Sequence, residues 1–172
     1  MNLREQILSE HSKSNAVLIA DWIGNNPQRF GALMQLLLKD EQKVVQRSAW
    51  VLSLVTDKNS ELITPYIEDM LALSARANVH VAVRRNLTRI LNKIPIPQNQ
   101  HEAIMNLCFK WLMNPKETVA VRCFSMEILC NLSHTYPELK NELIHIIKDA
   151  LEHQVVSAGF IATAKRSLKS LE

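Results

Sequence analysis

The amino-acid sequence predicts an all-α fold in which pairs of helices repeat along the chain, and three observations lead to this prediction. The 172 residues include only 3 Gly and 5% aromatic residues, which disfavours folds that need many tight turns. Apolar residues recur at three- and four-residue spacing, and no stretch alternates between apolar and polar residues with a period of two. Hydrophobic residues make up 47% of the chain and charged residues 22%, which is enough to bury a core. We therefore expect a folded, soluble, helical chain without a β-sheet.

Asn, Pro and short polar clusters divide the chain into ten helical segments. The expected helices span residues 2–9, 13–24, 27–39, 42–57, 60–75, 78–94, 99–113, 117–134, 137–153 and 155–171. The breakers that follow the second, fourth, sixth, seventh and eighth segments are, in chain order, Asn25-Asn26-Pro27, Asp57-Lys58-Asn59-Ser60, Ile94-Pro95-Ile96-Pro97, Asn114-Pro115 and Tyr136-Pro137. The segments then join into helix pairs.

The helix pairs repeat with a period of 37 to 38 residues. In the second helix of three successive pairs, Val45, Val83 and Val121 are 38 residues apart. Apolar residues of the first helices recur in the same register, at Phe30, Ile67, Met105 and Leu143. Such a period is typical of stacked helical repeats, in which each pair buries its apolar face against its neighbours. We predict one domain over residues 1–172, with repeats at roughly 1–25, 26–58, 59–96, 97–135 and 136–172.

A Val-Arg pair opens two of the second helices, at Val83-Arg84 and Val121-Arg122, and the segment Leu33–Asp40 precedes the second helix of an earlier copy. Together with the period, these features resemble the HEAT/armadillo-like α-solenoid family. The resemblance implies a right-handed α-α superhelix of about five helix pairs, with the second helices on its concave surface. It also implies a ladder between an Asp in the inter-helix turn and an Arg in the second helix. No copy retains both members, since the turn residues are Asp40, Asn78 and Lys116 and the Arg positions hold Gln46, Arg84 and Arg122.

The sequence contains none of the common catalytic or metal-binding motifs. Its 3 Cys include no CxxC pair, and no two of the 6 His stand three or four residues apart. We therefore expect no enzyme activity, no cofactor and no metal. The first residues form an amphipathic pattern rather than a signal peptide, and no apolar run approaches the roughly 20 residues that span a bilayer. We expect a cytoplasmic protein without a membrane segment.

A stripe of basic residues is the most informative polar feature of the sequence. Arg85, Arg89 and Lys93 recur every four residues in the segment 78–94, which contains no acidic residue. One repeat earlier, Arg47 occupies the position equivalent to Arg85. Like charges four residues apart weakly oppose helix formation, so helix stability does not explain the stripe. We predict a binding surface on the second helices that consists of Arg47, Trp50, Arg85, Arg89, Lys93, Lys165 and Arg166.

The repeat array, the absence of catalytic motifs and the basic stripe together predict a non-catalytic scaffold that binds an acidic protein partner. The formal net charge of +3 is a mild excess that is compatible with such a partner. Two other interpretations stay open. The stripe could be a solvated face whose acidic neighbours the sequence does not reveal. Alternatively, the surface binds nucleic acid, which is disfavoured because Glu127 stands at the position equivalent to Arg89 one repeat later.

A related alternative comes from the family resemblance. Some HEAT-like proteins are alkylpurine DNA glycosylases, which flank an extruded nucleotide with aromatic residues and an Asp. The adjacent pair Asp21-Trp22 is the feature of this sequence that keeps such an enzyme as an alternative. The sequence leaves the oligomeric state open.

Overall fold

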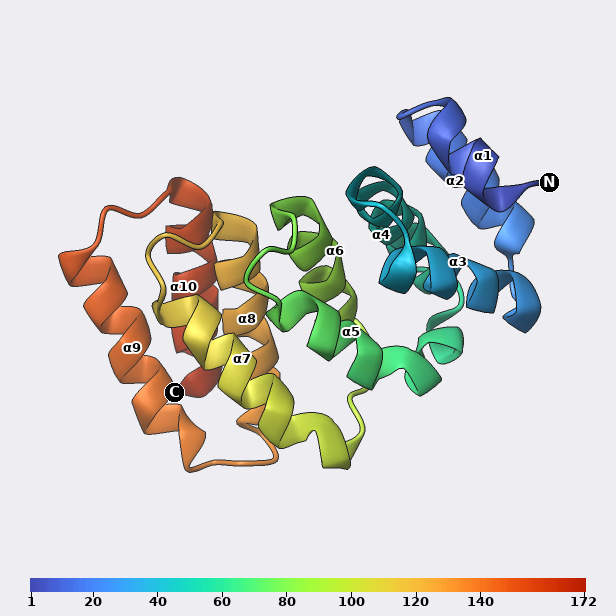
Figure 1. The fold of residues 1–172 in the computed structure, drawn as a ribbon. Coiled ribbons are helices and arrows are strands. Elements are labelled where there is room, and N and C mark those ends of the chain that lie inside the picture. The colour runs from blue at the N-terminus through green and yellow to red at the C-terminus, as the bar shows by residue number, and fades with distance from the viewer. The chain divides into compact units, whose positions relative to one another are not determined.

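The fold is all-α in the computed structural model, which describes residues 1–172 (Figure 1). The α-helices are α1 (Leu3–Ser9), α2 (Lys13–Ile23), α3 (Pro27–Lys39), α4 (Gln42–Thr56), α5 (Ile67–Ala75), α6 (Val81–Leu91), α7 (His101–Met113), α8 (Val119–Leu132), α9 (Leu139–His153) and α10 (Ala158–Leu171). Two 3-10 helices, η1 (Ser60–Tyr66) and η2 (Gln98–Gln100), precede α5 and α7. The ten expected helices are confirmed, and apart from the segment 60–75 their ends lie within three residues of the expected ones.

The segment 60–75, expected as one α-helix, is divided in the structure. Residues Ser60–Tyr66 form the 3-10 helix η1, and the α-helix begins only at Ile67. Pro65 lies inside η1 and lacks a backbone N–H, so it cannot donate the bond that would continue an α-helix. The apolar spacing of the segment therefore predicted helical turns correctly but not their type.

Side-chain caps fix where several of the helices begin. The side chain of Asn26 accepts a hydrogen bond from a backbone N–H in the first turn of α3, and Pro27 occupies the start of that helix. Ser12 and Ser157 cap α2 and α10 in the same way. At the other end of α2, Gly24 has a φ of 51°, a conformation that favours glycine. These local signals explain the close match between expected and observed ends.

The apolar stripes form the core, with a shift of one residue in two helices. The residues of the predicted period that are buried are Phe30, Ile67, Val83, Val121 and Leu143. Val45 and Met105 are only half-buried, whereas Val44 and Ile104 are fully buried with 0% exposure. The prediction was wrong at these two positions because neighbouring residues of a helix differ by only about 100° in direction, and both candidates were apolar.

The helices cluster into two compact units, Met1–Ile94 and Pro95–Glu172. In the first unit, α4 packs against α2, α3 and α6. In the second unit, α8 packs against α7 and α10. Within each unit the second helices of consecutive pairs therefore lie side by side. The single domain over residues 1–172 and its five repeat boundaries stay predictions.

Two arginines brace their helix pairs in the same way. The Nε of Arg84 donates to the carbonyl oxygen of Ser74 at 3.0 Å, and the Nε of Arg122 donates to that of Leu112 at 3.0 Å. In both cases the acceptor lies ten residues earlier, near the end of the first helix of the pair. Helix ends leave carbonyl groups without helical partners, and these side chains satisfy them. Arginine here closes its own helix pair, which is a different role from the predicted pairing with an Asp in the turn.

Candidate functional site

A shallow groove lies between the second helices α4 and α6 of the first unit. It has a volume of about 320 Å³. Its lining residues are His11, Gln46, Trp50, Ala82, Arg85 and Asn86. Two of the predicted binding residues, Trp50 and Arg85, therefore line one groove, from opposite helices. None of the six lining side chains carries a carboxylate, so the groove presents positive charge to a ligand.

Arg85 is the arginine of this groove, and its guanidinium group has no partner within the chain. Its side chain is exposed, and no ion pair or hydrogen bond engages it within the chain. An exposed guanidinium group offers five N–H donors in a planar fork that matches a carboxylate. The candidate site therefore contains one exposed guanidinium group without a partner in the chain.

The turn between α1 and α2 closes one side of the groove through His11. The rings of His11 and Trp50 lie 5.5 Å apart, edge to face. Asn15 fixes the turn, because its side-chain amide donates to the carbonyl oxygens of Gln6 and Glu10, both at 2.9 Å. Asn15 is itself buried, with 7% exposure. The turn thus holds His11 in place beside the indole ring.

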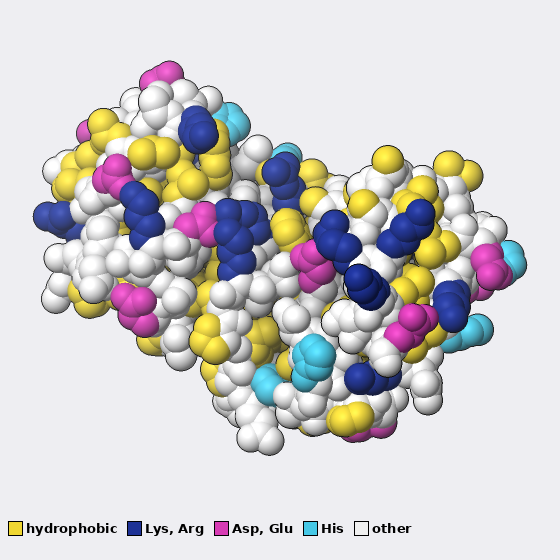
Figure 2. All heavy atoms as spheres, turned by 180° about the vertical axis from the view of Figure 1, so that it is seen from behind, with side chains coloured by type: hydrophobic (Ala, Val, Ile, Leu, Met, Phe, Trp, Pro, Cys, Tyr) yellow, Lys and Arg dark blue, Asp and Glu magenta, His cyan; other side chains and the backbone are white.

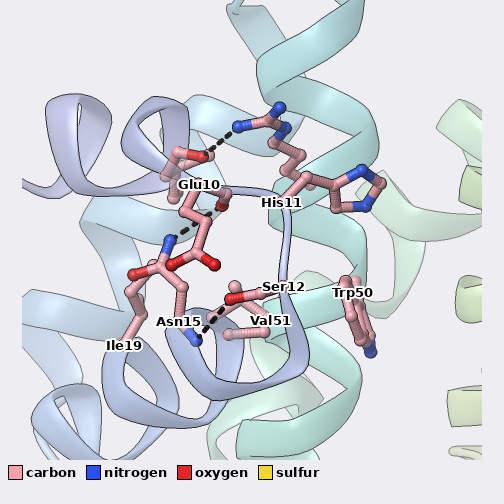
Figure 3. A pocket seen from close by; sticks show the side chains of 10 residues that line it. Glu10, His11, Ser12, Asn15, Ile19, Trp50 and Val51 are labelled. Atoms are coloured by element: carbon pink, nitrogen blue, oxygen red, sulfur yellow. Dashed lines mark hydrogen bonds between the residues drawn. The ribbon is translucent and has the colours of Figure 1, made fainter.

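A second, smaller cavity lies behind this aromatic pair (Figure 3). Glu10, Ser12 and Asn15 line it from the α1–α2 turn and its flanks, and Trp50 and Val51 line it from α4. Its volume is about 10 Å³, which is the room of a single water molecule. This cavity is a packing gap, and the open groove beside it is the candidate site.

Arg47, also predicted to bind a partner, is engaged within the chain. Its guanidinium group donates to the carbonyl oxygens of Ile7 and Leu8 at 2.9 and 3.0 Å. These carbonyls belong to the last turn of α1, where helical acceptors lack partners. Arg47 thereby ties α1 to α4, and it lines the small cavity rather than the groove.

Arg89 and Lys93, the other members of the stripe on and after α6, share one carboxylate. Asp57 accepts from Arg89 Nη2 and from Lys93 Nζ, both at 2.7 Å. Burial opposes the charge of Asp57, but the bonds from the two cations outweigh it, so the pKa of this carboxyl lies below its ordinary value of 3.8. The sequence could not place Asp57 opposite these side chains because it lies 32 and 36 residues away. Arg89 and Lys93 are therefore part of an internal charge cluster.

We expect Asp57→Asn to reduce the sensitivity of the fold to acid. Because the folded-state pKa of Asp57 is lowered, its carboxylate stabilises the fold above about pH 4, and this contribution is lost as the pH falls through the folded-state pKa. Urea unfolding at pH 7 and at pH 3 measures the effect. Between pH 7 and pH 3, the free energy of unfolding should fall less in the variant than in the natural chain. The difference should be less than about 1 kcal/mol, because the side chains of Asp57 and Arg89 are partly exposed.

Glu152→Gln is the matched control for this experiment. Glu152 is exposed near the end of α9 and has no ion pair. Its substitution should leave the pH dependence as it is. Equal acid sensitivity in Asp57→Asn and the natural chain would contradict the assignment of Asp57 as the acid-sensitive partner.

Lys165 and Arg166 belong to α10 in the second unit. Arg166 Nη2 pairs with Glu127 Oε1 at 3.3 Å and also donates to Thr163 Oγ1 at 3.2 Å. Lys165 is exposed and has no bond within the chain. Figure 2 likewise shows Asp and Glu side chains next to some of the Lys and Arg side chains. Of the predicted basic set, Arg85 and Lys165 keep their charge unpaired.

The Asp21-Trp22 pair lies outside the groove. Lys58 Nζ pairs with Asp21 Oδ1 at 2.8 Å. The guanidinium group of Arg29 lies over the Trp22 ring, 4.4 Å from its centroid. Neither residue lines the groove between α4 and α6. Asp21 and Trp22 therefore each contact a basic side chain of the chain itself, and they take no part in the groove.

Reactive and metal-binding groups do not gather anywhere in the chain. No cluster of three or more His, Cys, Asp and Glu side chains could hold a metal ion. Burial raises the pKa of the Cys108 thiol to about 12, which keeps it protonated near neutral pH. Cys108 thus behaves as a small apolar core residue.

Sequence reasoning missed His11, Gln46, Ala82 and Asn86 as lining residues. Gln46 and Trp50 stand four residues apart, as do Ala82 and Asn86, so helical spacing could have placed each pair on one face. His11 had no such signal, because it lies in a turn about 40 residues before Trp50 in the sequence. Only the folding of α1 and α2 onto α4 brings the two rings together.

Comparisons with known proteins agree with the helix-pair architecture. A family model described as a HEAT repeat domain matches residues 3–171. Searches of curated proteins and of solved structures found no match to the chain. None of the helices is both long and apolar enough to cross a bilayer. The match extends over nearly the whole sequence, and the chain, an all-α solenoid of helix pairs, therefore belongs to the HEAT repeat domain family.

Proposed function

We propose that this protein is a non-catalytic interaction scaffold that binds an acidic partner protein on the surface formed by α4 and α6. The observation that carries the proposal is Arg85, an exposed cation without an internal partner in a groove that lacks carboxylates. Family membership supports an interaction role, because stacked helical repeats offer extended surfaces for partners. HEAT repeats are generally non-catalytic, which supports a binding function without a cofactor.

The charge distribution supports a protein partner over a nucleic acid. Binding of nucleic acid requires several Lys or Arg side chains that neutralise phosphates in register. In the predicted set, Asp57 pairs with both Arg89 and Lys93 and offsets one of their two charges, and Glu127 pairs with Arg166. A single available guanidinium group suits one carboxylate of a protein better than a row of phosphates.

We also propose a cytoplasmic location for this scaffold. The three cysteines are all free, and Cys108 and Cys130 are buried. Free cysteines are typical of a reducing compartment. A fluorescent fusion of the full chain, followed by cell fractionation, tests this location.

Charge reversal at Arg85 tests the proposed function. The natural chain and Arg85→Glu are immobilised, the proteins that they retain from a cell extract are identified by mass spectrometry, and the strongest partner is purified. We expect an acidic protein whose dissociation constant rises about 10- to 100-fold with Arg85→Glu, because attraction to a carboxylate becomes repulsion. A partner variant with Lys in place of its contacting Asp or Glu should restore binding to Arg85→Glu.

Arg76→Glu is the matched control, since Arg76 is an exposed arginine of the same unit that does not line the groove. It should bind the purified partner as the natural chain does. The proposal is wrong if Arg85→Glu and the natural chain bind with equal affinity. It is also wrong if labelled duplex or single-stranded DNA binds more tightly than any protein, with a steep dependence on salt.

A further inference from the structure

The groove between α4 and α6 combines two kinds of recognition chemistry. We infer that its ligand is an unstructured segment of the partner in which an Asp or Glu lies next to an aromatic or aliphatic residue. The carboxylate pairs with Arg85, and the apolar side chain packs against Trp50. This inference rests on the proposed function and names the chemical class of the ligand.

Charge complementarity supplies the first argument for this ligand. Every element that borders the groove contributes a neutral or basic side chain: Gln46 and Trp50 from α4, Ala82, Arg85 and Asn86 from α6, and His11 from the α1–α2 turn. Asp57, at the end of α4, already accepts hydrogen bonds from Arg89 and Lys93. No carboxylate of the chain pairs with Arg85, so a carboxylate of the ligand does not have to displace one.

The aromatic side of the groove supplies the second argument. Trp50 is half-buried, and His11 contacts it edge to face, which leaves part of the indole ring in the groove lining. Ala82 lines the same groove from the opposite helix with a short side chain. An aromatic or aliphatic side chain of the ligand can remove this surface from water.

The amide side chains favour an extended main chain in the groove. Gln46 makes no hydrogen bond within the chain, so both its donor and its acceptor are available. Asn86 Nδ2 donates to the carbonyl oxygen of Ala82 at 2.9 Å, which leaves the amide oxygen as an acceptor. An unpaired peptide backbone offers the complementary N–H and C=O groups.

The size of the groove favours a short segment. A volume of about 320 Å³ lies at the lower end of the range for ligand sites, which suits a few side chains.

A peptide-display selection tests the inference with a defined probe. A phage library of random dodecapeptides is selected against the natural full-length chain, against Arg85→Gln and against the matched control Arg76→Gln. The natural chain and Arg76→Gln should enrich peptides that place Asp or Glu beside an aromatic or aliphatic residue. Arg85→Gln should not enrich them. The selected consensus peptide, synthesised with a fluorescent label, should bind Arg85→Gln at least about tenfold more weakly than the natural chain.

Tryptophan emission locates the bound peptide. The chain has 3 Trp, and Trp22 and Trp111 lie outside the groove. The unlabelled peptide should change the emission of the natural chain but not that of Trp50→Phe. Circular dichroism of each variant confirms that it is folded before binding is measured.

Three outcomes would overturn the inference. They are the absence of any peptide enriched relative to Arg85→Gln, a consensus without a carboxylate, and an emission change that persists in Trp50→Phe. The proposed function survives these outcomes if an acidic folded partner still depends on Arg85 for binding. The failure of the inference is therefore distinguishable from the failure of the function.

Discussion

Phe160→Ala is expected to lower the free energy of unfolding by about 3–5 kcal/mol. Phe160 is fully buried in α10, with 0% exposure, so its removal leaves a cavity that a packed interior fills only in part. The ring also lies 4.4 Å from the guanidinium carbon of Arg122. The substitution therefore removes both buried apolar surface and a cation–π contact. Urea unfolding followed by circular dichroism measures the loss.

Phe160→Leu and Ile161→Ala are the controls for this prediction. Leucine retains most of the buried volume, so Phe160→Leu should lose less stability than Phe160→Ala. Ile161 is the next residue on α10 but is only half-buried, and its truncation should also cost less. If all three variants unfold at the same urea concentration, Phe160 does not anchor the second unit.

Arg122→Met should lower the free energy of unfolding by about 2–4 kcal/mol. Arg122 is 5% exposed and donates to the carbonyl oxygen of Leu112 at 3.0 Å and to the side chain of Gln154 at 2.8 Å. Methionine preserves much of the side-chain volume but leaves both acceptors without this donor. Burial lowers the pKa of Arg122, and the side chain stays charged near neutral pH because an arginine titrates far above it. The urea experiment used for Phe160 measures this loss.

Arg85→Met provides the matched control for Arg122. Arg85 is exposed and has no internal partner, so its replacement should change the stability by less than about 0.5 kcal/mol. Arg122→Lys should be intermediate, because one ammonium group lacks the planar fork. A double-mutant cycle with Phe160→Ala should give a coupling energy of about 0.5–2 kcal/mol. Zero coupling would show that the contact with the ring contributes nothing.

Helix positions were predictable from the sequence because their signals are local. Asn26 and Pro27 act within the first turn of α3, and Gly24 acts at the end of α2. Pro65 changed the helix type in η1 without changing the helical spacing of apolar residues. The one-residue shift at Val45 and Met105 arose where adjacent apolar residues competed for the core. Which of the two adjacent residues becomes buried depends on contacts with the neighbouring helices, and the local sequence does not specify these contacts.

The candidate site was predictable only in part because its electrostatics depend on contacts between repeats. The spacing of Arg85, Arg89 and Lys93 predicted a basic stripe, and these residues do lie on or directly after one helix. Asp57, which precedes them by 32 and 36 residues, accepts hydrogen bonds from Arg89 and Lys93 and so pairs two of the three cations within the chain. Arg47 likewise bonds to carbonyl groups about 40 residues away. The open interpretation of a solvated face with unseen acidic neighbours describes Arg89 and Lys93, whereas Arg85 fits the binding interpretation.

The anchoring of the α1–α2 turn has a consequence for how the groove between α4 and α6 can change in evolution. Asn15 and Arg47 hold the turn through hydrogen bonds to the backbone carbonyl groups of residues 6, 7, 8 and 10, which do not depend on the side chains at these positions. The residue at position 11 is exposed and contributes no bond to this support. If the groove binds the ligand that we propose, exchange of the single exposed side chain at position 11, next to Trp50, can change its ligand preference without altering the packing of the helices.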